Sequence, residues 1–304
     1  MPHSTVKPTS MNRSRIQIAK PDILAFFSDQ MPSILRERQI AVALTQQRRI
    51  WRLAQSTSLA AFIDFLLKSG RLKQHKFEFP HRPETVYTWG DVPAMEMLLS
   101  IKPNSYFSHY TALRLHGLTE QVPKFVYISH DRSTEASPNL DITQAAIDES
   151  FRLPVRVSKN VVDFEEQRIV LLNSANTGQL GVVDESLQQG EGSAARLRVT
   201  GPERTLIDAA VRPTYCGGVA EVAKAYELAK GQVSVNALAA MLPRMKFAYP
   251  YHQAIGFYLE RAGYRESALD LLRRFPMKYD FYLAHDMVET RYEPDWRLHV
   301  PKSF

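Results

Sequence analysis

Two neighbouring polar residues and a nearby histidine have the types and spacing that could support nucleophilic catalysis. Ser108 and His109 are adjacent and His116 follows, so a nucleophile could pair with a base. A serine triad also needs an orienting carboxylate and a strained turn, and the G-x-S-x-G context of such a turn is missing. Structural roles are therefore favoured for both histidines, as for most histidines near a helix.

Acidic residues offer two further groups that could bind a metal ion. His285 and Glu289 are four residues apart, which on a helix places them on one face. A four-coordinate site needs more ligands, so a coincidental pair is favoured. Asp184 and Glu185 end a predicted strand and could gather with Asp208 around a divalent ion in a hydrolase or phosphotransferase. The lysine of the D…(D/E)xK nuclease pattern is absent, so we expect no catalytic residue, no metal and no cofactor.

Positive charge is concentrated in the first part of the chain. The protein has a formal net charge of +6, and residues 1–82 contain 14 Lys and Arg against 5 Asp and Glu. A basic module attached to a slightly acidic remainder is typical of a nucleic-acid-binding unit joined to a domain with another task. A basic surface with no partner is the plain alternative.

The elements that would position these charges are short helices followed by a hairpin. The predicted helices span 21–27, 33–44, 47–54 and 59–68. Basic and apolar residues alternate over 71–79, and a second strand follows at 86–89 after two prolines. This order is that of a winged helix-turn-helix, in which a capped helix start and the hairpin approach duplex phosphates.

The candidate DNA-binding residues are basic side chains near the last helix and along the hairpin, together with hydroxyls at the helix start. They are Arg48, Arg49, Arg52, Ser56, Thr57, Ser58, Arg71, Lys73, Lys76 and Arg82. The helix itself carries Asp64 and has no Arg or Asn facing outward in its first turn. Reading of base edges is therefore expected to be weak.

Beyond a boundary expected near 90–93, the pattern changes to longer mixed elements. The sequence predicts an α+β protein with a disordered tail over 1–20, a winged helix-turn-helix over 21–93 and a larger domain over 94–304. That domain divides into a mixed α/β part, 94–200, and a mainly helical part, 201–304. Helices are expected at 203–211, 219–230, 235–245, 251–262 and 266–274, and a hairpin joins 169–172 to 179–183.

Composition excludes several classes of protein. The 304 residues are 44% hydrophobic and 23% charged, as in folded globular chains of two or three domains. The most apolar stretch, 59–67, is interrupted by Asp64 and is too short to cross a bilayer, so no membrane partner is expected. The one cysteine, Cys216, cannot form an internal disulfide, and a reducing cytoplasm fits best.

Several longer runs resemble the AbiEi family, the antitoxins of type IV toxin-antitoxin systems that act in abortive infection. The runs are YFSHYTAL at 106–113, HGL at 116–118, VPK at 122–124 leading into YI at 127–128, NTGQLGV at 176–182, ERTLID at 203–208, VRP at 211–213, YPYHQAIGFYLE at 249–260, WRL at 296–298 and PK at 301–302. The resemblance spans most of the chain from about residue 33.

The resemblance implies an N-terminal winged helix that binds double-stranded promoter DNA and represses the antitoxin's own gene. It also implies a C-terminal antitoxin domain that neutralises a nucleotidyltransferase-like toxin, with or without direct contact. A stand-alone winged-helix transcriptional regulator is an alternative. The metal-dependent hydrolase or phosphotransferase using Asp184, Glu185 and Asp208 is a less favoured one.

Overall fold

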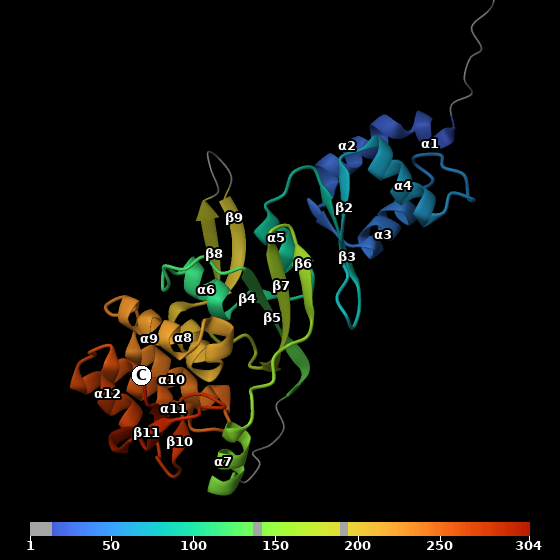
Figure 1. Ribbon diagram of the computed structural model, residues 1–304. Helices are drawn as coiled ribbons and strands as arrows, with labels where there is room; N and C mark the ends of the chain where they lie inside the picture. The colour runs from blue at the N-terminus through green and yellow to red at the C-terminus, as the bar shows by residue number, and fades with distance from the viewer. Residues whose placement is uncertain (1–13, 136–141, 189–193) are drawn as a thin grey trace, which may run out of the picture. The chain divides into compact units, whose positions relative to one another are not determined.

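The computed structural model describes residues 14–135, 142–188 and 194–304 (Figure 1). Within these ranges, helices combine with one six-stranded sheet and two three-stranded sheets, so the fold is a mixture of helices and strands, as predicted. The described residues form two compact units, which divide at Lys76, Pro83 and Ser100. No helix in the described ranges is long and apolar enough to cross a bilayer.

The first unit takes its residues from the described chain up to Lys76 and from Glu84–Ser100. Its elements are α1 (Arg15–Ile18), α2 (Lys20–Gln30), β1 (Ile34–Leu35), α3 (Glu37–Gln47), α4 (Leu59–Ser69), β2 (Leu72–Phe77), β3 (Glu84–Trp89) and α5 (Ala94–Leu99). The strands lie in the order β1-β3-β2. Apolar residues four apart, Ile23 and Phe27 in α2 and Phe62 and Leu66 in α4, are fully buried in one core.

Two of the expected helices in this unit are wrong in part. The chain turns over residues 48–52 instead of continuing as the helix predicted at 47–54, because Trp51 and Leu53 enter the core and Arg52 adopts a left-handed backbone conformation with φ 52°. The helix predicted from residue 33 begins only at Glu37, because Ile34 and Leu35 pair with β3 as a short antiparallel strand.

The disordered tail expected over 1–20 is wrong for the last residues of that range. Residues 1–13 lie outside the described ranges, but Arg15–Ile18 form α1, and Ala19 is buried in the core. The expected domain boundary at 90–93 lies before α5, whereas the compact units divide after Ser100. The segment Phe77–Pro83 groups with the second unit.

The second unit begins with a mixed sheet of strand order β6-β7-β5-β4-β9-β8. Its elements are β4 (Tyr106–Phe107), α6 (His109–Leu115), β5 (Phe125–Glu135), α7 (Gln144–Arg152), β6 (Val161–Phe164), β7 (Gln167–Asn176), β8 (Val182–Gln188) and β9 (Ala194–Thr200). The hairpin expected between 169–172 and 179–183 is wrong, because β7 lies between β5 and β6 while β8 pairs with β9 at the sheet edge.

The helical part of the second unit follows the expected pattern closely. Its helices are α8 (Pro202–Val211), α9 (Val219–Leu228), α10 (Val235–Met245), α11 (Tyr251–Arg261) and α12 (Glu266–Arg273), which gather at the orange and red end of the chain in Figure 1. Helix α8 packs against α6, α9, α10 and α11. A small sheet that the sequence did not predict closes the unit, with strands β10 (Phe281–Tyr282), β11 (Thr290–Glu293) and β12 (Leu298–Pro301).

Candidate functional site

The loop between α3 and α4 carries the first group of predicted DNA-binding residues. The Arg48 guanidinium donates to the carbonyl oxygens of Ala54 at 2.7 Å and Thr57 at 2.9 Å, so it holds this loop in shape. Arg49 and Arg52 are exposed. We therefore assign Arg48 to the architecture of the loop, while the other two arginines are available to an anionic partner.

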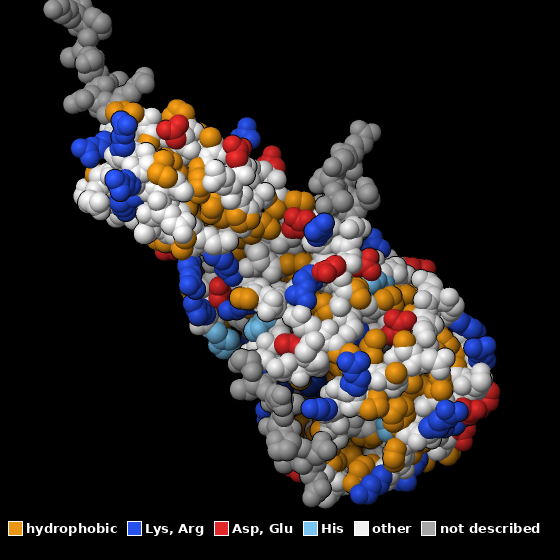
Figure 2. Space-filling view, turned by 180° about the vertical axis from the view of Figure 1, so that it is seen from behind, with side chains coloured by type: hydrophobic (Ala, Val, Ile, Leu, Met, Phe, Trp, Pro, Cys, Tyr) orange, Lys and Arg blue, Asp and Glu red, His pale blue; other side chains and the backbone are white. Residues whose placement is uncertain are grey.

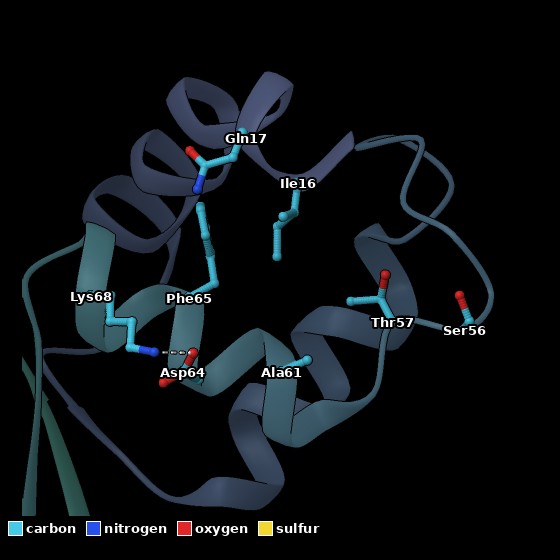
Figure 3. Close-up of a pocket in the computed structure, with 8 residues that line it drawn as sticks. All are labelled: Ile16, Gln17, Ser56, Thr57, Ala61, Asp64, Phe65 and Lys68. Atoms are coloured by element: carbon cyan, nitrogen blue, oxygen red, sulfur yellow. Dashed lines mark ion pairs between the residues drawn. The ribbon is translucent and has the colours of Figure 1, made fainter. Parts of the chain in front are cut away.

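The start of α4 carries the predicted hydroxyl groups. Ser58 is the N-cap residue, and its hydroxyl oxygen accepts from the backbone N–H of Ala61 at 3.2 Å. Ser56 and Thr57 border a hollow to which Ile16 and Gln17 of α1 also contribute (Figure 3). Ser56 and Thr57 thus belong to the same loop as the exposed arginines and precede the N-terminus of α4, where backbone N–H groups favour an anion.

The exposed side of α4 carries little that could read a base. Asp64 and Lys68 form an ion pair at 2.9 Å across one helical turn, as Figure 3 shows. Ala60 and Ala61 are the other exposed residues near its start. None of these side chains offers the bidentate donors of Arg or Asn, so this surface suits contacts with phosphates more than contacts with bases.

The basic residues of β2 are divided between the two faces of its sheet. Lys73 and Lys76 are three residues apart, and side chains at odd spacing in a strand point in opposite directions. Lys73 donates to the Asp91 carboxylate at 2.7 Å, and this hydrogen bond lowers the pKa of Asp91. Arg71 is exposed just before the strand. The basic residues of the hairpin therefore do not form one continuous face.

Arg82 stands apart from the rest of the predicted set. It lies in the segment Phe77–Pro83 of the second unit, where it lines a hollow together with Lys102 and Lys159. The face drawn in Figure 2 shows Lys and Arg side chains interspersed with acidic and hydrophobic ones. Lys102 and Lys159 could not be predicted as members of this hollow, because its residues come from distant parts of the chain.

The pair Ser108 and His109 is buried and has a structural role. The Ser108 hydroxyl is fully buried and lies 2.9 Å from His109 Nδ1 and 2.7 Å from the Ser129 hydroxyl. Burial lowers the pKa of His109 to about 4, so its ring is neutral at pH 7. His116 Nε2 lies 2.7 Å from the carbonyl oxygen of Thr200. A fully buried hydroxyl cannot reach a substrate, and both histidines connect α6 to its surroundings.

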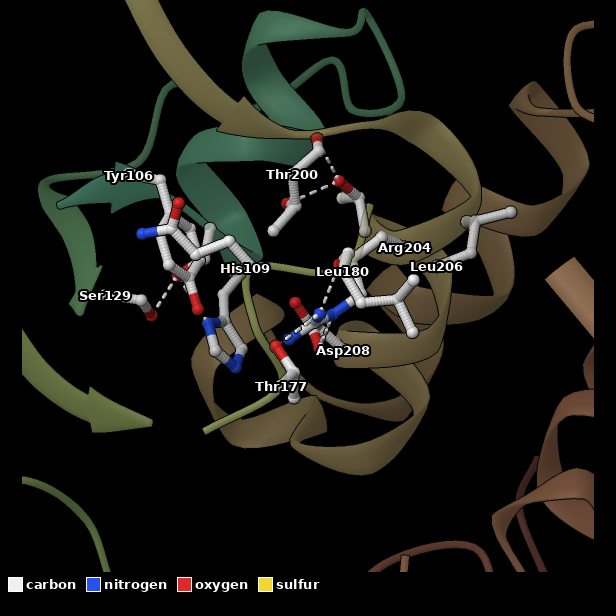
Figure 4. Close-up of polar contacts among 12 residues, drawn as sticks. Tyr106, His109, Ser129, Thr177, Leu180, Thr200, Arg204, Leu206 and Asp208 are labelled. Carbon is white, nitrogen blue, oxygen red and sulfur yellow. Dashed lines mark hydrogen bonds and ion pairs between the residues drawn. The ribbon is translucent and has the colours of Figure 1, made fainter. Parts of the chain in front are cut away.

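A buried ion pair forms the centre of the polar contacts in Figure 4. Arg204 Nε donates to Asp208 Oδ1 at 2.8 Å within α8, and Arg204 Nη1 donates to the carbonyl oxygen of Leu180 at 2.6 Å. Tyr106 donates to Asp131 Oδ1 at 2.7 Å, and the other oxygen of Asp131 accepts from the backbone N–H of Thr177 at 3.0 Å. These contacts fix the turn after β7 against both the sheet and α8.

The carboxylates of the enzyme alternative do not share a site. Asp208 faces Arg204 in the interior, whereas Asp184 is exposed on β8 and lies 3.8 Å from Arg198. Within the described ranges, no group of three or more His, Cys, Asp or Glu side chains is placed to hold a metal ion. The geometric basis for a metal-dependent hydrolase using Asp184, Glu185 and Asp208 is therefore lost.

The pair His285 and Glu289 is not on a helix, so the spacing of four residues does not place the two side chains on one face. His285 stacks on Phe151 with ring centroids 4.1 Å apart, because the chain crosses α7 at this point as an irregular segment. Glu289 forms an ion pair with Lys302 at 3.5 Å. The two side chains thus have separate structural partners.

The buried histidines predict a pH dependence of stability. Burial also lowers the pKa of His252 to about 4, below the value of about 6.5 in an unfolded chain. As the pH falls, the His252 imidazole is therefore protonated in the unfolded chain before it is protonated in the folded protein. The free energy of unfolding is highest above about pH 6.5 and decreases as the pH falls toward 4.

When the pH is lowered from about 7.5 to about 5, the free energy of unfolding should fall in both proteins. We expect the fall in the His252→Gln variant to be smaller than in the parent protein by on the order of 1–2 kcal/mol. Urea unfolding of both proteins at the two pH values measures the difference. Equal losses in the two proteins would show that His252 is protonated in the folded state.

Comparisons with known proteins identify the fold and no family. No protein-family model and no curated protein matches the sequence. Among solved structures, the crystal structure of the RV2827C protein from Mycobacterium tuberculosis is similar, with a TM-score of 0.56 and 16% sequence identity. The match covers 97% of this chain and 95% of that chain. The two proteins therefore share a fold over nearly their whole lengths.

Proposed function

We propose that this protein is a DNA-binding antitoxin of a type IV toxin-antitoxin system, and that its first unit is a winged helix-turn-helix. The observation that carries the DNA-binding part is the order of elements α2, β1, α3, α4, β2 and β3, with the strands arranged β1-β3-β2. Helix α3, the loop and α4 correspond to the helix-turn-helix, and β2 with β3 to the wing.

The proposed DNA contacts centre on the α3–α4 loop. Arg49 and Arg52 are exposed there, next to Ser56 and the N-terminus of α4. Guanidinium groups beside a helix N-terminus bind phosphate through charge and hydrogen bonds together. Arg71 and Lys76 add exposed positive charge from the wing. Contacts of this kind give affinity for duplex DNA with modest preference for its sequence.

The toxin-neutralising part of the proposal rests on the resemblance to the AbiEi family. The runs that carry it lie mainly in the second unit, at 106–113, 203–208 and 249–260. We propose that this unit neutralises a nucleotidyltransferase-like toxin while the first unit represses the promoter. The stand-alone regulator remains the competing function, since it would use the same first unit without a toxin.

Gel shifts of the full-length protein on its own upstream DNA test the promoter-binding part. We expect the double variant Arg49→Ala/Arg52→Ala to bind at least about tenfold more weakly than the parent, because two phosphate contacts are removed. Lys224→Ala, an exposed change in the second unit, serves as the control and should bind like the parent. Unchanged binding by the double variant would contradict the proposed contacts.

Growth rescue separates the antitoxin from the stand-alone regulator. We expect the full chain to restore growth of cells that express the neighbouring gene product if that product is toxic. We also expect the Arg49→Ala/Arg52→Ala variant to rescue equally well when it is expressed from an unrelated promoter. Promoter binding without any rescue would favour the stand-alone regulator.

The Lys73–Asp91 ion pair predicts a gain of DNA affinity. The Asp91 side chain is almost fully exposed, and its carboxylate pairs with the ammonium group of Lys73 in the wing. We expect Asp91→Ala to tighten DNA binding about twofold to fivefold at low salt, because Lys73 is then released to the phosphates. Titration of labelled duplex measures this change, and unchanged binding by Asp91→Ala would show that Lys73 has no part in the interface.

A further inference from the structure

The exposed face of α3 carries the polar side chains that the start of α4 lacks. Ile40, Ala43 and Leu44 pack into the core, so the opposite side of the helix faces outward. The exposed residues on that side are Arg38, Val42, Thr45 and Gln46. Arg and Gln have the paired hydrogen-bonding groups that match guanine and adenine in the major groove. The side chains suited to base recognition are therefore found on α3.

Two of the exposed polar groups of α3 are occupied within the helix. The Gln39 amide oxygen accepts from a backbone N–H at the helix start at 2.8 Å, and the Thr45 hydroxyl donates to the carbonyl oxygen one turn back at 2.9 Å. Arg38 and Gln46 are exposed and form no hydrogen bond or ion pair with another described residue. These two side chains are therefore available to DNA, and Val42, 45% exposed, lies between them.

The acidic residue of α3 points to the side of this face. Glu37 borders a separate hollow together with Leu59 of α4 and Gln74 of β2. Adjacent residues of a helix point about 100° apart, so the Glu37 carboxylate is turned away from the direction of Arg38. The outward face of α3 can therefore approach the phosphates of a duplex with little repulsion.

A proposed phosphate contact lies at the far end of the same face. Arg49 follows Arg38 by eleven residues, which is close to three full turns of a helix. The chain keeps helical dihedral angles at Arg48, with φ −48° and ψ −45°, so Arg49 follows on nearly the same side. A duplex whose phosphate is bound by Arg49 would therefore meet the exposed face of α3.

Contacts at both ends hold α3 in place. At its start, the Arg36 guanidinium donates to the carbonyl oxygen of Thr85 at 2.7 Å and lies 3.5 Å from the Glu84 carboxylate. At its end, the Arg48 guanidinium binds carbonyl oxygens of the α3–α4 loop. Side chains on a fixed helix can contact bases without ordering of the backbone, which lowers the entropic cost of specific binding.

We propose that α3, rather than α4, is the helix that distinguishes DNA bases, with Arg38 bound to a guanine, Gln46 to an adenine and Val42 against a thymine methyl group. Arg38 and Gln46 are eight residues apart, about 12 Å along the helix, so the two base pairs that they contact should lie within about four steps of each other. This inference rests on the proposed DNA-binding function and assigns the residues that set its sequence preference.

Selection of duplexes from a random library by the full-length protein, followed by sequencing, tests the proposal. We expect the parent to enrich one sequence and to bind it at least about tenfold more tightly than a shuffled duplex of the same length. Arg38→Lys keeps the positive charge but loses the bidentate donors of arginine, so it should lose the preference for a guanine. Its affinity for the shuffled duplex should change less than about twofold, because the charge is retained.

Gln46→Ala should lose the preference for an adenine, at a position within about four base pairs of that guanine. Lys68→Ala, an exposed change in α4, is the matched control and should enrich the same sequence as the parent. Circular dichroism shows whether each variant is folded.

Three results would overturn the assignment of base recognition to α3 and leave the proposed DNA binding in place. The first is duplex binding with no enriched sequence. The second is a sequence that Arg38→Lys and Gln46→Ala enrich as the parent does, or that Lys68→Ala alone fails to enrich. The third is a changed oligomeric state of the α3 variants with an unchanged preference, which would assign this face to contacts between copies of the chain. Failure of the parent to bind any duplex would instead remove the proposed function together with this inference.

Discussion

Replacement of Asp208 by alanine is expected to lower the free energy of unfolding by about 3–5 kcal/mol. Asp208 and Arg204 are buried together in α8, and the Arg204 side chain is 4% exposed. Without the carboxylate, the guanidinium keeps its hydrogen bond to Leu180 but loses its counter-charge in the interior. An unpaired charge away from water is much less stable than the pair, which explains the size of the expected loss.

A matched pair of variants separates this effect from ordinary loss of a surface contact. Glu227→Ala removes the partner of Lys224 from an exposed ion pair in α9 and should cost less than about 1 kcal/mol. The double variant Arg204→Met/Asp208→Leu should be more stable than Asp208→Ala, because it leaves no buried charge. Urea unfolding measures all three. If Asp208→Ala costs no more than Glu227→Ala, water reaches Arg204 and the ion pair is not a core feature.

Replacement of Gly256 by alanine is expected to destabilise the helical part by about 3 kcal/mol or more, at the upper end of the range for overpacked cores. Gly256 lies in α11 against Trp296, which is fully buried, and an added Cβ would overlap the indole ring. The ring cannot move freely, because Trp296 Nε1 donates to Glu260 at 2.8 Å. Its backbone carbonyl also accepts from Gln253 at 2.7 Å.

A double-mutant cycle tests whether the contact with Trp296 causes this loss. Trp296→Leu alone should be destabilising, because it removes buried aromatic surface. Adding Gly256→Ala to that variant should cost far less than the same change costs in the parent protein, so the two free energies should not add. Additive losses would show that contacts other than the one with Trp296 cause the effect of Gly256→Ala.

Local signals explain why the helices of the second unit could be predicted from the sequence. Val235–Met245 has the same bounds as the prediction, because Ser234 caps the helix and its apolar residues recur at helical spacing. The start of α8 follows from Pro202 at the first helical position. Strand pairing depends on distant parts of the chain, which is why β7 and β8 were wrongly joined as a hairpin.

The candidate site was predictable only as a set of residue types. The sequence locates Arg48 beside Arg49, but only the structure shows that the Arg48 guanidinium binds loop carbonyls. The sequence does not predict that Arg82 and Lys102 line the same hollow, because their proximity depends on the packing of Phe77 and Phe79.

The sequence runs that resemble the AbiEi family contribute much of the buried polar centre. Tyr106, His109, Arg204 and Asp208 all lie within these runs, and all are buried. Their residue types are explained by hydrogen bonds and an ion pair inside the fold. The resemblance is therefore carried largely by residues that build the core, whereas the residues proposed to contact DNA lie outside these runs.

The salt dependence of DNA binding tests the central claim most directly. If Arg49, Arg52 and one basic residue of the wing each contact a phosphate, a plot of log affinity against log salt should have a slope near −3, at about −0.9 per contact. The Arg49→Ala/Arg52→Ala variant should flatten that slope by about two. Binding of upstream duplex by the full-length protein that does not change with salt, or an equal slope in the variant, would contradict the account.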